Sequence, residues 1–471
     1  MPEPHWPPLT ELRSMLGRGE LTSTEVVARC LDRIEEINPV VNAVLVTDPT
    51  APEQARTSDR QLAAGSARPL EGIPVLVKDS VDTAGLATTA GSRLLAGAPP
   101  GADADVVRLI RLAGGIVLGK TNMSEWGNFR SVHGTEGWSA VGGQTWNPYA
   151  LDHSPGGSSS GSAVAVATGM APVAAGTDTD GSIICPAALN GVVGVRPELG
   201  LLPSRGVVPI SAVADTPGVV TTTVADAAAL LDALAGTGTA APVPAAGLRI
   251  GLWRGQKMPA AVHGILDEAA AALEAAGAVV VPVELPLDQR VLDDGLAALI
   301  AEFQPSLDAY LRTRPGAPQS LTALIDANRA DPVELSVFDQ ALFEHAAGLT
   351  EERRRAAPAA RAAARDWARS VLDTLLGDGL AMIVAPTSEP SWLVDHRAGD
   401  PPVRNTTTVP SLAGYPNVSV PVGFVGELPV GVSVFGPTST SETLPLAATV
   451  EAVCGARREP RLPNRKVRTL R

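Results

Sequence analysis

The sequence predicts an α/β protein of three layers, in which helices cover both faces of one large mixed sheet of mostly parallel type. From about Gly72, short apolar runs alternate with helical segments, which is the pattern of a sheet covered on both faces. Strand-like runs return near the C-terminus after a long helical stretch. Because this return favours one sheet closed by distant segments, we predict a single domain over residues 1–471.

The N-terminal part, about residues 1–65, is expected to be helical. Residues 8–45 carry a periodic apolar face, and Ser23 or Thr24 is a suitable N-cap for the second half of this segment. These helices are predicted to serve as scaffold.

A catalytic core is predicted over residues 72–235. The runs IPVLVKD and GIVLGKT are expected to be strands, and VVRLIRLAG between them a helix. Residues 134–162 are rich in Gly, Ser, Asn and Pro and are predicted to form a loop.

The C-terminal half begins with strand, helix and strand over residues 248–285. Residues 291–378 are mainly helical and interrupt the sheet without adding strands, so we expect them to form a substrate-facing insert. The runs AMIVAPT, PNVSVPVGF and PVGVSVFGP then restore strand character.

Composition and charge restrict the function. With 45% apolar and 18% charged residues the chain is an ordinary globular protein, and its net charge of −13 opposes nucleic-acid binding. The basic tail 457–471 is the exception; it could suit an anionic partner, although a solvated terminus is the simpler interpretation.

The compartment is predicted from cysteines and from the N-terminus. Cys30, Cys185 and Cys454 lie far apart without CxxC spacing, so neither disulfides nor a metal site is expected, and no cofactor is predicted. The chain start lacks signal-peptide features, and no stretch reaches about 18 apolar residues. We therefore predict a cytoplasmic enzyme that does not enter a membrane.

A nucleophile-elbow motif, G-x-S-x-G, occurs at residues 157–161 and is centred on Ser159. It would predict an α/β-hydrolase with an acid and a histidine downstream. An irregular loop precedes it in place of a strand, and the downstream His263, His345 and His396 stand in helical or polar contexts. This alternative is therefore the less favoured one.

Ser182 is a second candidate nucleophile, in GTDTDGSIICPAA. A serine that enters a helix from a Gly-containing turn has backbone N–H groups directed past it, which is the geometry of an oxyanion hole. The candidate donors are the amides of Thr179, Asp180, Gly181 and Ser182 itself. The alternative is that Ser182 simply caps the helix.

Lysine is rare, because only four of the 37 basic residues are lysines. Arginine cannot give up its proton in a protein, whereas a buried lysine can act as a base. Lys78 follows the apolar run IPVLV, so either a carboxylate such as Asp79 pairs with it or its pKa is lowered. Lys120 has a similar context, and for both the alternative is a side chain that reaches the surface.

Two long stretches of the chain carry a recognisable pattern, SPGGSSSGSAVAVATGMAPVAAGTDTDGSIICPAALNGVVGVRP and LEGIPVLVKDSVDTAGLATTAGS. The first resembles the signature of the amidase signature family, and the second is similar to the lysine segment of the same family. GIVLGKTNMSEWGNFR, GGQTWNPY, MIVAPT and AGYPNVSVPVGF extend the similarity over residues 9–437. TDGSIICPAA, GWSAVGGQTWNPY and FDQALFEHA resemble the peptide-amidase-like branch. The resemblance implies the amidase signature fold.

The resemblance also implies roles for individual residues. Ser182 would be the nucleophile, Ser158 a bridging serine preceded by a cis peptide bond, and Lys78 the base of a Ser/Ser/Lys triad. The amides of residues 179–182 would bind the oxyanion, while Asp178 orients this loop and Ser159 supports the site. No histidine is needed.

Candidate substrate contacts are less specific. Five of the sixteen aromatic residues fall between residues 126 and 149, which suggests a pocket wall, although packing of a long loop explains the cluster equally well. The candidates for substrate binding are Trp126, Phe129, Trp138, Gly157, Cys185, Ser388 and Glu389.

Several positions depart from the common family pattern. Asp180 stands where many members have glycine and Ile184 where many have arginine; the peptide-amidase-like branch shares both features. Val219, Val220 and Thr222, and the pair Ser388 and Glu389, also differ. These departures concern the substrate and leave the nucleophile unaffected.

The resemblance predicts an amide hydrolase that forms an acyl-enzyme on Ser182, with a C-terminal peptide amide or another primary amide as substrate. The alternatives are an aryl-acylamidase or esterase, a biosynthetic acyltransferase with the same site, and, less favoured, a glutamine amidotransferase subunit. We expect a monomer or homodimer.

Overall fold

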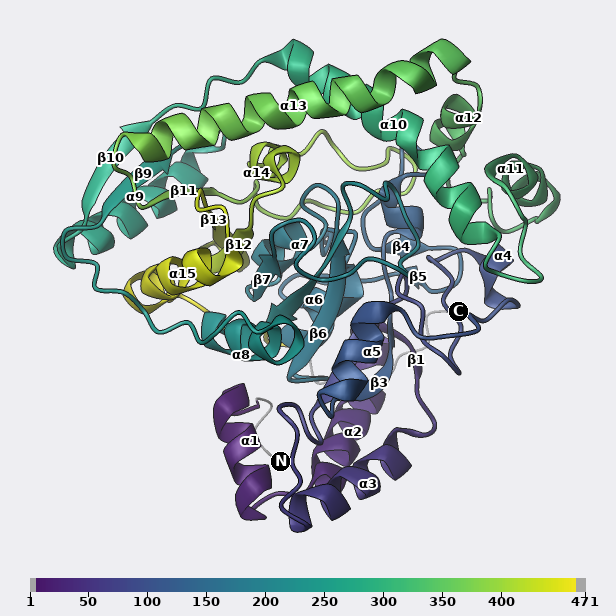
Figure 1. Ribbon diagram of the computed structural model, residues 1–471, viewed down its shortest axis with the longest axis horizontal. Helices are drawn as coiled ribbons and strands as arrows, with labels where there is room; N and C mark the ends of the chain where they lie inside the picture. The colour runs from purple at the N-terminus through teal and green to yellow at the C-terminus, as the bar shows by residue number, and fades with distance from the viewer. Residues whose placement is uncertain (1–5, 463–471) are drawn as a thin grey trace.

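An eleven-stranded sheet forms the centre of the molecule in the computed structural model, which describes residues 6–462 (Figure 1). The strand order is β1-β3-β2-β6-β8-β7-β12-β13-β11-β9-β10. The strands are β1 (Val44–Thr47), β2 (Pro74–Lys78), β3 (Ile116–Thr121), β6 (Val173–Asp178), β7 (Val193–Arg196), β8 (Thr216–Thr221), β9 (Arg249–Trp253), β10 (Val279–Val283), β11 (Met382–Pro386), β12 (Asn417–Val425) and β13 (Leu428–Phe435).

The sheet is mixed, as predicted, but it is not mostly parallel. The parallel pairs are β2 with β3 and β6, and β9 with β10 and β11. The other pairs of this sheet are antiparallel, including β12–β13, which are joined only by Gly426 and Glu427. So short a connection permits only an antiparallel hairpin, because a parallel pair needs a long crossover.

Helices cover both faces of the sheet, which confirms the three-layer prediction. On β2, Val75 and Val77 face a cluster that includes residues of α1 (Leu9–Arg18), α5 (Asp105–Leu112), α8 (Val224–Ala235), α9 (Ala260–Ala275) and α15 (Thr440–Cys454). Leu76 points the other way, toward α2 (Ser23–Val41), α3 (Ala51–Ala63), α6 (Ser160–Ala167) and α7 (Ile184–Leu189). Alternate side chains of a strand therefore fill two separate cores.

The N-terminal segment is mostly helical but also supplies the edge strand β1, which pairs antiparallel with β3. The cap of α2 is Thr22, one residue before the predicted Ser23. Thr22 accepts a hydrogen bond from the Glu25 amide, and the Glu25 side chain accepts one from the Thr22 amide. This reciprocal capping box satisfies two amides that the first helical turn leaves free.

The region between β10 and β11 contains α10 (Gln289–Leu311), α11 (Leu321–Ala330), α12 (Ala341–Ala347) and α13 (Glu351–Gly377), and no strand was found within it. We call residues 289–377 the helical insert. Long α10 and α13 pack side by side across the top of Figure 1. The role of the insert toward substrate, like the single-domain assignment, stays a prediction.

Two buried ion-pair networks attach the helical insert to the core. Arg314 lies 3.1 Å from Asp82, and the Glu334 carboxylate lies 3.4 Å from Arg130. All four side chains are at least nine-tenths buried. Because removing one partner would leave an uncompensated buried charge, these contacts hold the insert firmly.

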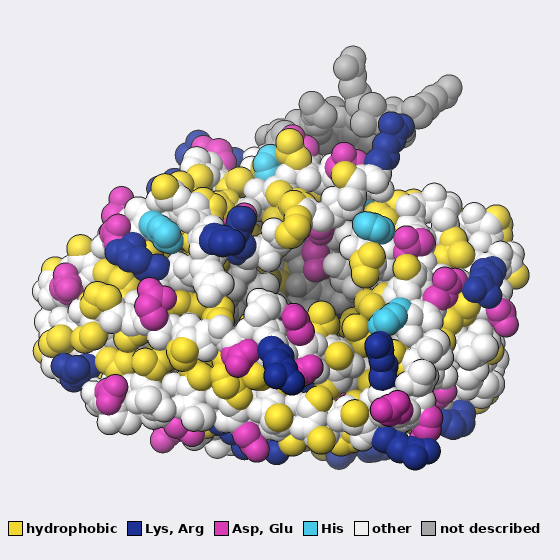
Figure 2. All heavy atoms as spheres, turned by 90° about the horizontal axis from the view of Figure 1, so that it is seen from above, with side chains coloured by type: hydrophobic (Ala, Val, Ile, Leu, Met, Phe, Trp, Pro, Cys, Tyr) yellow, Lys and Arg dark blue, Asp and Glu magenta, His cyan; other side chains and the backbone are white. Residues whose placement is uncertain are grey.

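The remaining short elements are η1 (Glu125–Asn128), β4 (Trp138–Ser139), β5 (Gly143–Gln144), α4 (Arg93–Ala96) and α14 (Thr408–Ala413). Figure 2 shows acidic and basic side chains interspersed on one face, with a hollow near its centre. No helix among residues 6–462 has both the length and the apolar character to cross a membrane. Of the basic tail, Arg465, Lys466, Arg468 and Arg471 lie outside the described residues.

Candidate active site

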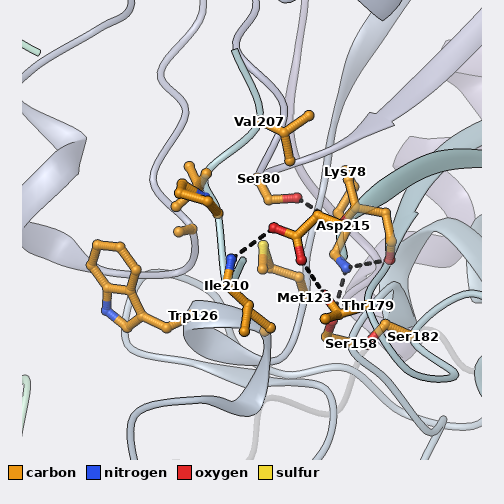
Figure 3. A pocket seen from close by; sticks show the side chains of 15 residues that line it. Lys78, Ser80, Met123, Trp126, Ser158, Thr179, Ser182, Val207, Ile210 and Asp215 are labelled. Atoms are coloured by element: carbon orange, nitrogen blue, oxygen red, sulfur yellow. Dashed lines mark hydrogen bonds between the residues drawn. The ribbon is translucent and has the colours of Figure 1, made fainter. Parts of the chain in front are cut away.

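The candidate residues meet where the neighbouring parallel strands β2 and β6 end. Lys78 is the last residue of β2 and Asp178 the last residue of β6. The carboxyl ends of parallel strands share one edge of a sheet, and this edge is a common place for active sites. The Gly- and Ser-rich loop before α6 brings Ser158 to the same edge (Figure 3).

Lys78 is fully buried, so the alternative in which its side chain reaches the surface is wrong. Its Nζ donates to Ser158 Oγ at 2.8 Å and to the Thr177 carbonyl at 3.2 Å. Burial lowers the pKa of Lys78 to about 7, although the Asp178, Glu136 and Asp215 carboxylates act in the opposite direction. At neutral pH a large fraction of Lys78 is therefore uncharged.

Asp79 does not pair with Lys78. It lies 3.5 Å from Lys120, which is also fully buried and donates to the Val81 carbonyl at 2.5 Å and to Thr88 Oγ1 at 2.8 Å. Lys120 thus has a carboxylate partner and holds the loop after β2. The two lysines with similar sequence contexts have different environments.

Ser158 follows a cis peptide bond with Gly157, as the resemblance implies. Next to it, Ser159 Oγ donates to the Thr177 carbonyl at 3.1 Å, the same carbonyl that Lys78 contacts. The Ser159 amide donates to the Ser182 carbonyl at 2.9 Å. These contacts connect the serine loop, the lysine and the loop that carries Ser182.

The histidines of the nucleophile-elbow alternative have other partners. His396 Nε2 contacts Gln144 Oε1 at 2.8 Å, His263 lies 3.3 Å from the Arg254 carbonyl, and His345 lies on α12 of the helical insert. The contacts found around the Ser159 hydroxyl come from the backbone of residue 177, so the described structure offers it no base.

Asp178 holds the turn from residue 179 to residue 182. Its Oδ1 accepts from the Gly181 amide at 2.9 Å and its Oδ2 from the Ile183 amide at 2.6 Å. Arg196 Nε lies 3.3 Å from Oδ1. Asp178 is therefore placed to orient this loop, and its part in the reaction stays a prediction.

This arrangement engages one of the predicted oxyanion donors, and the predicted set, the amides of residues 179–182, stays a prediction. The single N–H of Gly181 is already engaged by Asp178, so it can serve an oxyanion only if Asp178 releases it. The amides of Thr179, Asp180 and Ser182 stay candidates. The helix-cap alternative for Ser182 is wrong, because α7 begins at Ile184 and its N-cap is Ile183 without a side-chain cap.

Lys78, Ser158 and Ser182 line one small cavity of about 20 Å³ (Figure 3). A buried water needs roughly 10–15 Å³ measured in this way, so the cavity holds about one water-sized group. We call it the catalytic cavity. Its other lining residues are Ser80, Ala90, Met123, Trp126, Gly127, Thr177, Thr179, Val207, Val208, Pro209, Ile210 and Asp215.

Asp215 is a buried carboxyl group of this cavity that sequence reasoning missed. Its Oδ1 accepts from Thr179 Oγ1 at 2.6 Å, and its Oδ2 accepts from the Ile210 amide at 2.8 Å. Burial raises the pKa of Asp215 to about 6. Its place in the site follows from the antiparallel pairing of β8 with β6, in which Thr216 lies opposite Asp178, and the sequence carried no local signal of this pairing.

The aromatic cluster of the sequence divides in the structure. Trp126 lines the catalytic cavity. Phe129 packs on Phe303 of the helical insert at 4.8 Å between ring centroids, and Trp138 packs on Phe338 at 5.1 Å. The pocket-wall hypothesis is therefore supported for Trp126 alone, and packing explains the other two.

The remaining predicted contact residues do not line the catalytic cavity. Ser388 and Glu389 lie in the loop after β11, where Glu389 pairs with Arg404. Asp180 is exposed, and its carboxylate accepts from Thr407 Oγ1 at 2.8 Å and Thr408 Oγ1 at 2.9 Å. Cys185 is half-buried beside Gly181. Substrate contacts at Ser388, Glu389 and Cys185 stay predictions, as does the role of the Asp180 amide as an oxyanion donor.

Glu136 packs directly against Gly157. Its carboxyl group accepts hydrogen bonds from Ser124 Oγ and, at 3.3 Å, from Asn128 Nδ2. Burial raises the pKa of Glu136 to about 7. A Cβ at position 157 would overlap Glu136 Oε2 and Ser124 Oγ, so only glycine fits here.

Gly157→Ala is expected to lower the free energy of unfolding by about 1–3 kcal/mol, because the added methyl group overpacks this site. It should also lower kcat/KM by displacing Ser158. Thermal unfolding and amide-hydrolysis kinetics would measure both effects. Gly264→Ala in α9 is the control, since nothing lies within 4 Å of its added Cβ. A Gly157→Ala protein as stable as the wild type would contradict the expectation.

Among the described residues, no group of three or more His, Cys, Asp or Glu side chains is arranged to hold a metal ion. The prediction that no metal or cofactor is needed stays a prediction.

Comparison with known proteins supports the resemblance. The sequence model of the family described as Amidase matches residues 25–444. A protein of Arabidopsis thaliana named a probable amidase is 34% identical over 464 residues, which cover 92% of this chain and 87% of that protein.

Two further relatives differ in the activities that their names state. A glutamyl-tRNA(Gln) amidotransferase subunit of Aromatoleum aromaticum is 34% identical over 471 residues, covering 91% of this chain and 93% of that protein. The crystal structure of the native peptide amidase from Stenotrophomonas maltophilia superimposes with a TM-score of 0.90 at 40% identity, covering 97% of this chain and 98% of that one.

Proposed function

The chain belongs to the amidase signature family of amide hydrolases, and we propose that it cleaves a primary carboxamide through an acyl-enzyme on Ser182. The proposal takes Ser182 as nucleophile, Ser158 as proton relay and Lys78 as base. The Lys78–Ser158 hydrogen bond of 2.8 Å, in a cavity that Ser182 also lines, supports these roles.

In the first half-reaction, neutral Lys78 accepts the proton of Ser158, and Ser158 accepts the proton of Ser182 as Ser182 Oγ attacks the amide carbonyl. The negative charge that develops on the carbonyl oxygen is stabilised by backbone amides of the loop from Thr179 to Ser182. The relay then returns a proton to the amide nitrogen, so the C–N bond breaks and ammonia leaves.

In the second half-reaction, water attacks the acyl-enzyme. Its proton moves through Ser158 to Lys78, and the return of a proton to Ser182 Oγ releases the carboxylic acid. The buried position of Lys78 serves both half-reactions. Burial lowers its pKa to about 7, so at neutral pH its amine can both accept and donate a proton.

The likeness to a peptide amidase carries the preference for a primary amide. The leaving nitrogen must lie beside Ser158, which delivers its proton. A C-terminal peptide amide is the best substrate, given the 40% identity with a peptide amidase.

The alternatives use the same residues. An aryl-acylamidase or esterase would release an aromatic amine or an alcohol, and an acyltransferase would let an amine replace water. The amidotransferase relatives make a glutamine-hydrolysing subunit the remaining candidate. Copurification with partner subunits would favour that candidate over an independent monomer or homodimer.

A substrate panel tests the proposal. Amidated dipeptides, fatty amides, anilides and glutamine are assayed with the purified chain for release of ammonia, aniline and acid. We expect the highest kcat/KM with amidated peptides, together with one ammonia per acid. Preferred turnover of anilides would refute the primary-amide assignment.

The pH dependence should report on Lys78. Its neutral form is the active one, so kcat/KM is expected to rise as pH increases through about 7 and to be lost as pH falls below that value. Glu136 has a pKa of about 7 as well, so Glu136→Gln is the control. The rise of kcat/KM with pH should persist in that variant. If the rise disappears, it reports the titration of Glu136, and the assignment to Lys78 is wrong.

A further inference from the structure

One carboxyl group beside the catalytic residues has no part in the reaction as proposed. Glu136 lies in the loop between η1 and β4, and its carboxyl group packs against Gly157, the residue before Ser158. Ser158 Oγ in turn lies 2.8 Å from Lys78 Nζ. A carboxyl group and the proposed base therefore contact two consecutive residues of the loop before α6.

Several hydrogen bonds fix the position of Glu136. Its carboxyl group accepts from Ser124 Oγ, and the Ser124 amide donates to the Ser158 carbonyl at 3.2 Å. The Glu136 amide donates to Asp400 Oδ2 at 2.7 Å, and the Glu136 carbonyl accepts from Gln144 Nε2 at 2.8 Å. The carboxyl group cannot turn away from the loop before α6 without breaking the contact with Ser124.

The hydrogen-bond donors to this carboxyl group are neutral, namely the Ser124 hydroxyl and the Asn128 amide. Burial and the charge of Asp400 raise the pKa of Glu136 to about 7, whereas the charge of Lys78 acts in the opposite direction. The negative charge of Glu136 and the positive charge of Lys78 therefore stabilise each other.

The charges that face Lys78 are unequal in their other duties. Burial lowers the pKa of Lys78, and the carboxylates of Asp178, Glu136 and Asp215 oppose this effect, in that order. Asp178 is paired with Arg196 at 3.3 Å, and both Asp178 and Asp215 also hold the loop that carries the nucleophile. Glu136 contacts the loop before α6 instead, so its charge can be changed without releasing the nucleophile loop.

We propose that Glu136 is a positioning residue that acts through Lys78: its carboxylate stabilises the ammonium form that Lys78 takes when it accepts the proton of Ser158. This inference rests on the proposed function, because it requires Lys78 to be the base. The proton moves from Ser158 Oγ to Lys78 Nζ and later returns by the same way. Glu136 itself neither gains nor loses a proton in these steps.

The effect of removing the charge has a definite sign. A nearby negative charge raises the pKa of an amine, so without it Lys78 loses its proton at lower pH. In Glu136→Gln the rise of kcat/KM with pH should persist, but its midpoint should move to lower pH by roughly 0.5–1 unit. This is less than the shift of about 1–3 units that an opposite charge in direct contact produces.

The pH profile of kcat/KM with an amidated dipeptide tests the inference. Glu451→Gln is the matched control, because burial raises the pKa of Glu451 to about 7 as well. Glu451 lies on α15, where it accepts from the Val224 amide at 3.0 Å, and the carboxylates that act on Lys78 do not include it. We expect the wild-type midpoint in this control.

A midpoint comes from active molecules only, so it does not depend on how much of a variant folds. If Glu136→Gln is slower at every pH but keeps the wild-type midpoint, Glu136 has a merely structural role and the inference is overturned. A midpoint that moves to higher pH would overturn it as well.

Two further measurements cover a Glu136→Gln protein that turns over too slowly. The rate at which a fluorophosphonate labels Ser182 needs the same base but no later step, and its midpoint should move in the same direction. Glu136→Asp keeps the charge, so its midpoint should stay close to that of the wild type. A shift in Glu136→Asp as large as in Glu136→Gln would contradict an effect of charge.

These failures are distinguishable from failure of the proposed function. If Lys78→Met is still fully active at neutral pH, the base assignment itself is wrong. If Lys78→Met is inactive while Glu136→Gln keeps the wild-type midpoint, only the role of Glu136 is wrong.

Discussion

Ser182→Ala is expected to reduce amide hydrolysis by a factor on the order of 10⁴–10⁶, because removal of the nucleophile in a comparable hydrolase site has an effect of this size. The fold should be unchanged, since Ser182 is half-buried and its carbonyl, which binds the Ser159 amide, remains. Steady-state kinetics with an amidated dipeptide and a thermal unfolding curve would measure both quantities.

A covalent experiment separates the two serine hypotheses. A fluorophosphonate probe followed by peptide mass spectrometry should label Ser182 in the wild-type protein and in Ser159→Ala, and should not label Ser182→Ala. Ser159→Ala is the informative control because Ser159 is not among the residues that line the catalytic cavity, and its hydroxyl bonds to the Thr177 carbonyl. Labelling of Ser159 would revive the nucleophile-elbow hypothesis.

Lys78→Met is expected to reduce turnover by a factor on the order of 10³–10⁴, because general acid–base catalysis contributes up to about 10⁴-fold. The same change should leave the melting temperature unchanged or raise it. Methionine matches the length of the side chain, and a buried amine without a carboxylate partner costs free energy that an apolar side chain does not.

Lys120→Met is the matched control, since Lys120 is equally buried but lies 3.5 Å from Asp79. Its replacement leaves a buried carboxylate without its cation, so stability should fall by about 3–5 kcal/mol. The change in stability should therefore differ in sign between the two variants. Lys78→Met is expected to be inactive but at least as stable as the wild type, whereas Lys120→Met is expected to be less stable. A fully active Lys78→Met enzyme at neutral pH would refute the base assignment.

Much of the sheet follows from local patterns. The runs that contain Lys78 and Lys120 have the length and apolar character of buried parallel strands, and they form β2 and β3. The segment after Gly247 follows the predicted order of strand, helix and strand. Every residue of β2 and β3 is buried. Strands that are buried on both faces have nearly continuous apolar sequences, which is why these two could be recognised from their composition.

Strand direction was predicted less well. The strands β12 and β13 are antiparallel because only two residues connect them. Strand β8 lies between β6 and β7 in the sheet although it follows both in the sequence. An apolar run shows that a strand is buried, but it does not show which neighbour the strand pairs with.

For the site, sequence reasoning found the residues that carry unusual chemistry and missed the one that has an ordinary appearance. Lys78 stood out because lysine is rare here, whereas Asp215 precedes Thr-Pro-Gly as many turn residues do. Its place beside Thr179 depends on the antiparallel register of β6 and β8. Tertiary pairing of this kind has no local signature.

The helical insert has a consequence for how enzymes with this sheet diverge. Phe343 of the insert packs edge-on against Trp126, with ring centroids 5.7 Å apart, while Tyr310 and Arg314 contact Asp82 in the loop after β2. One continuous stretch of chain between β10 and β11 thus packs against the wall of the catalytic cavity, and it contributes none of Lys78, Ser158 or Ser182. If the insert faces the substrate as predicted, we expect its exchange between relatives to change the amides that are accepted while the proposed catalytic residues stay the same.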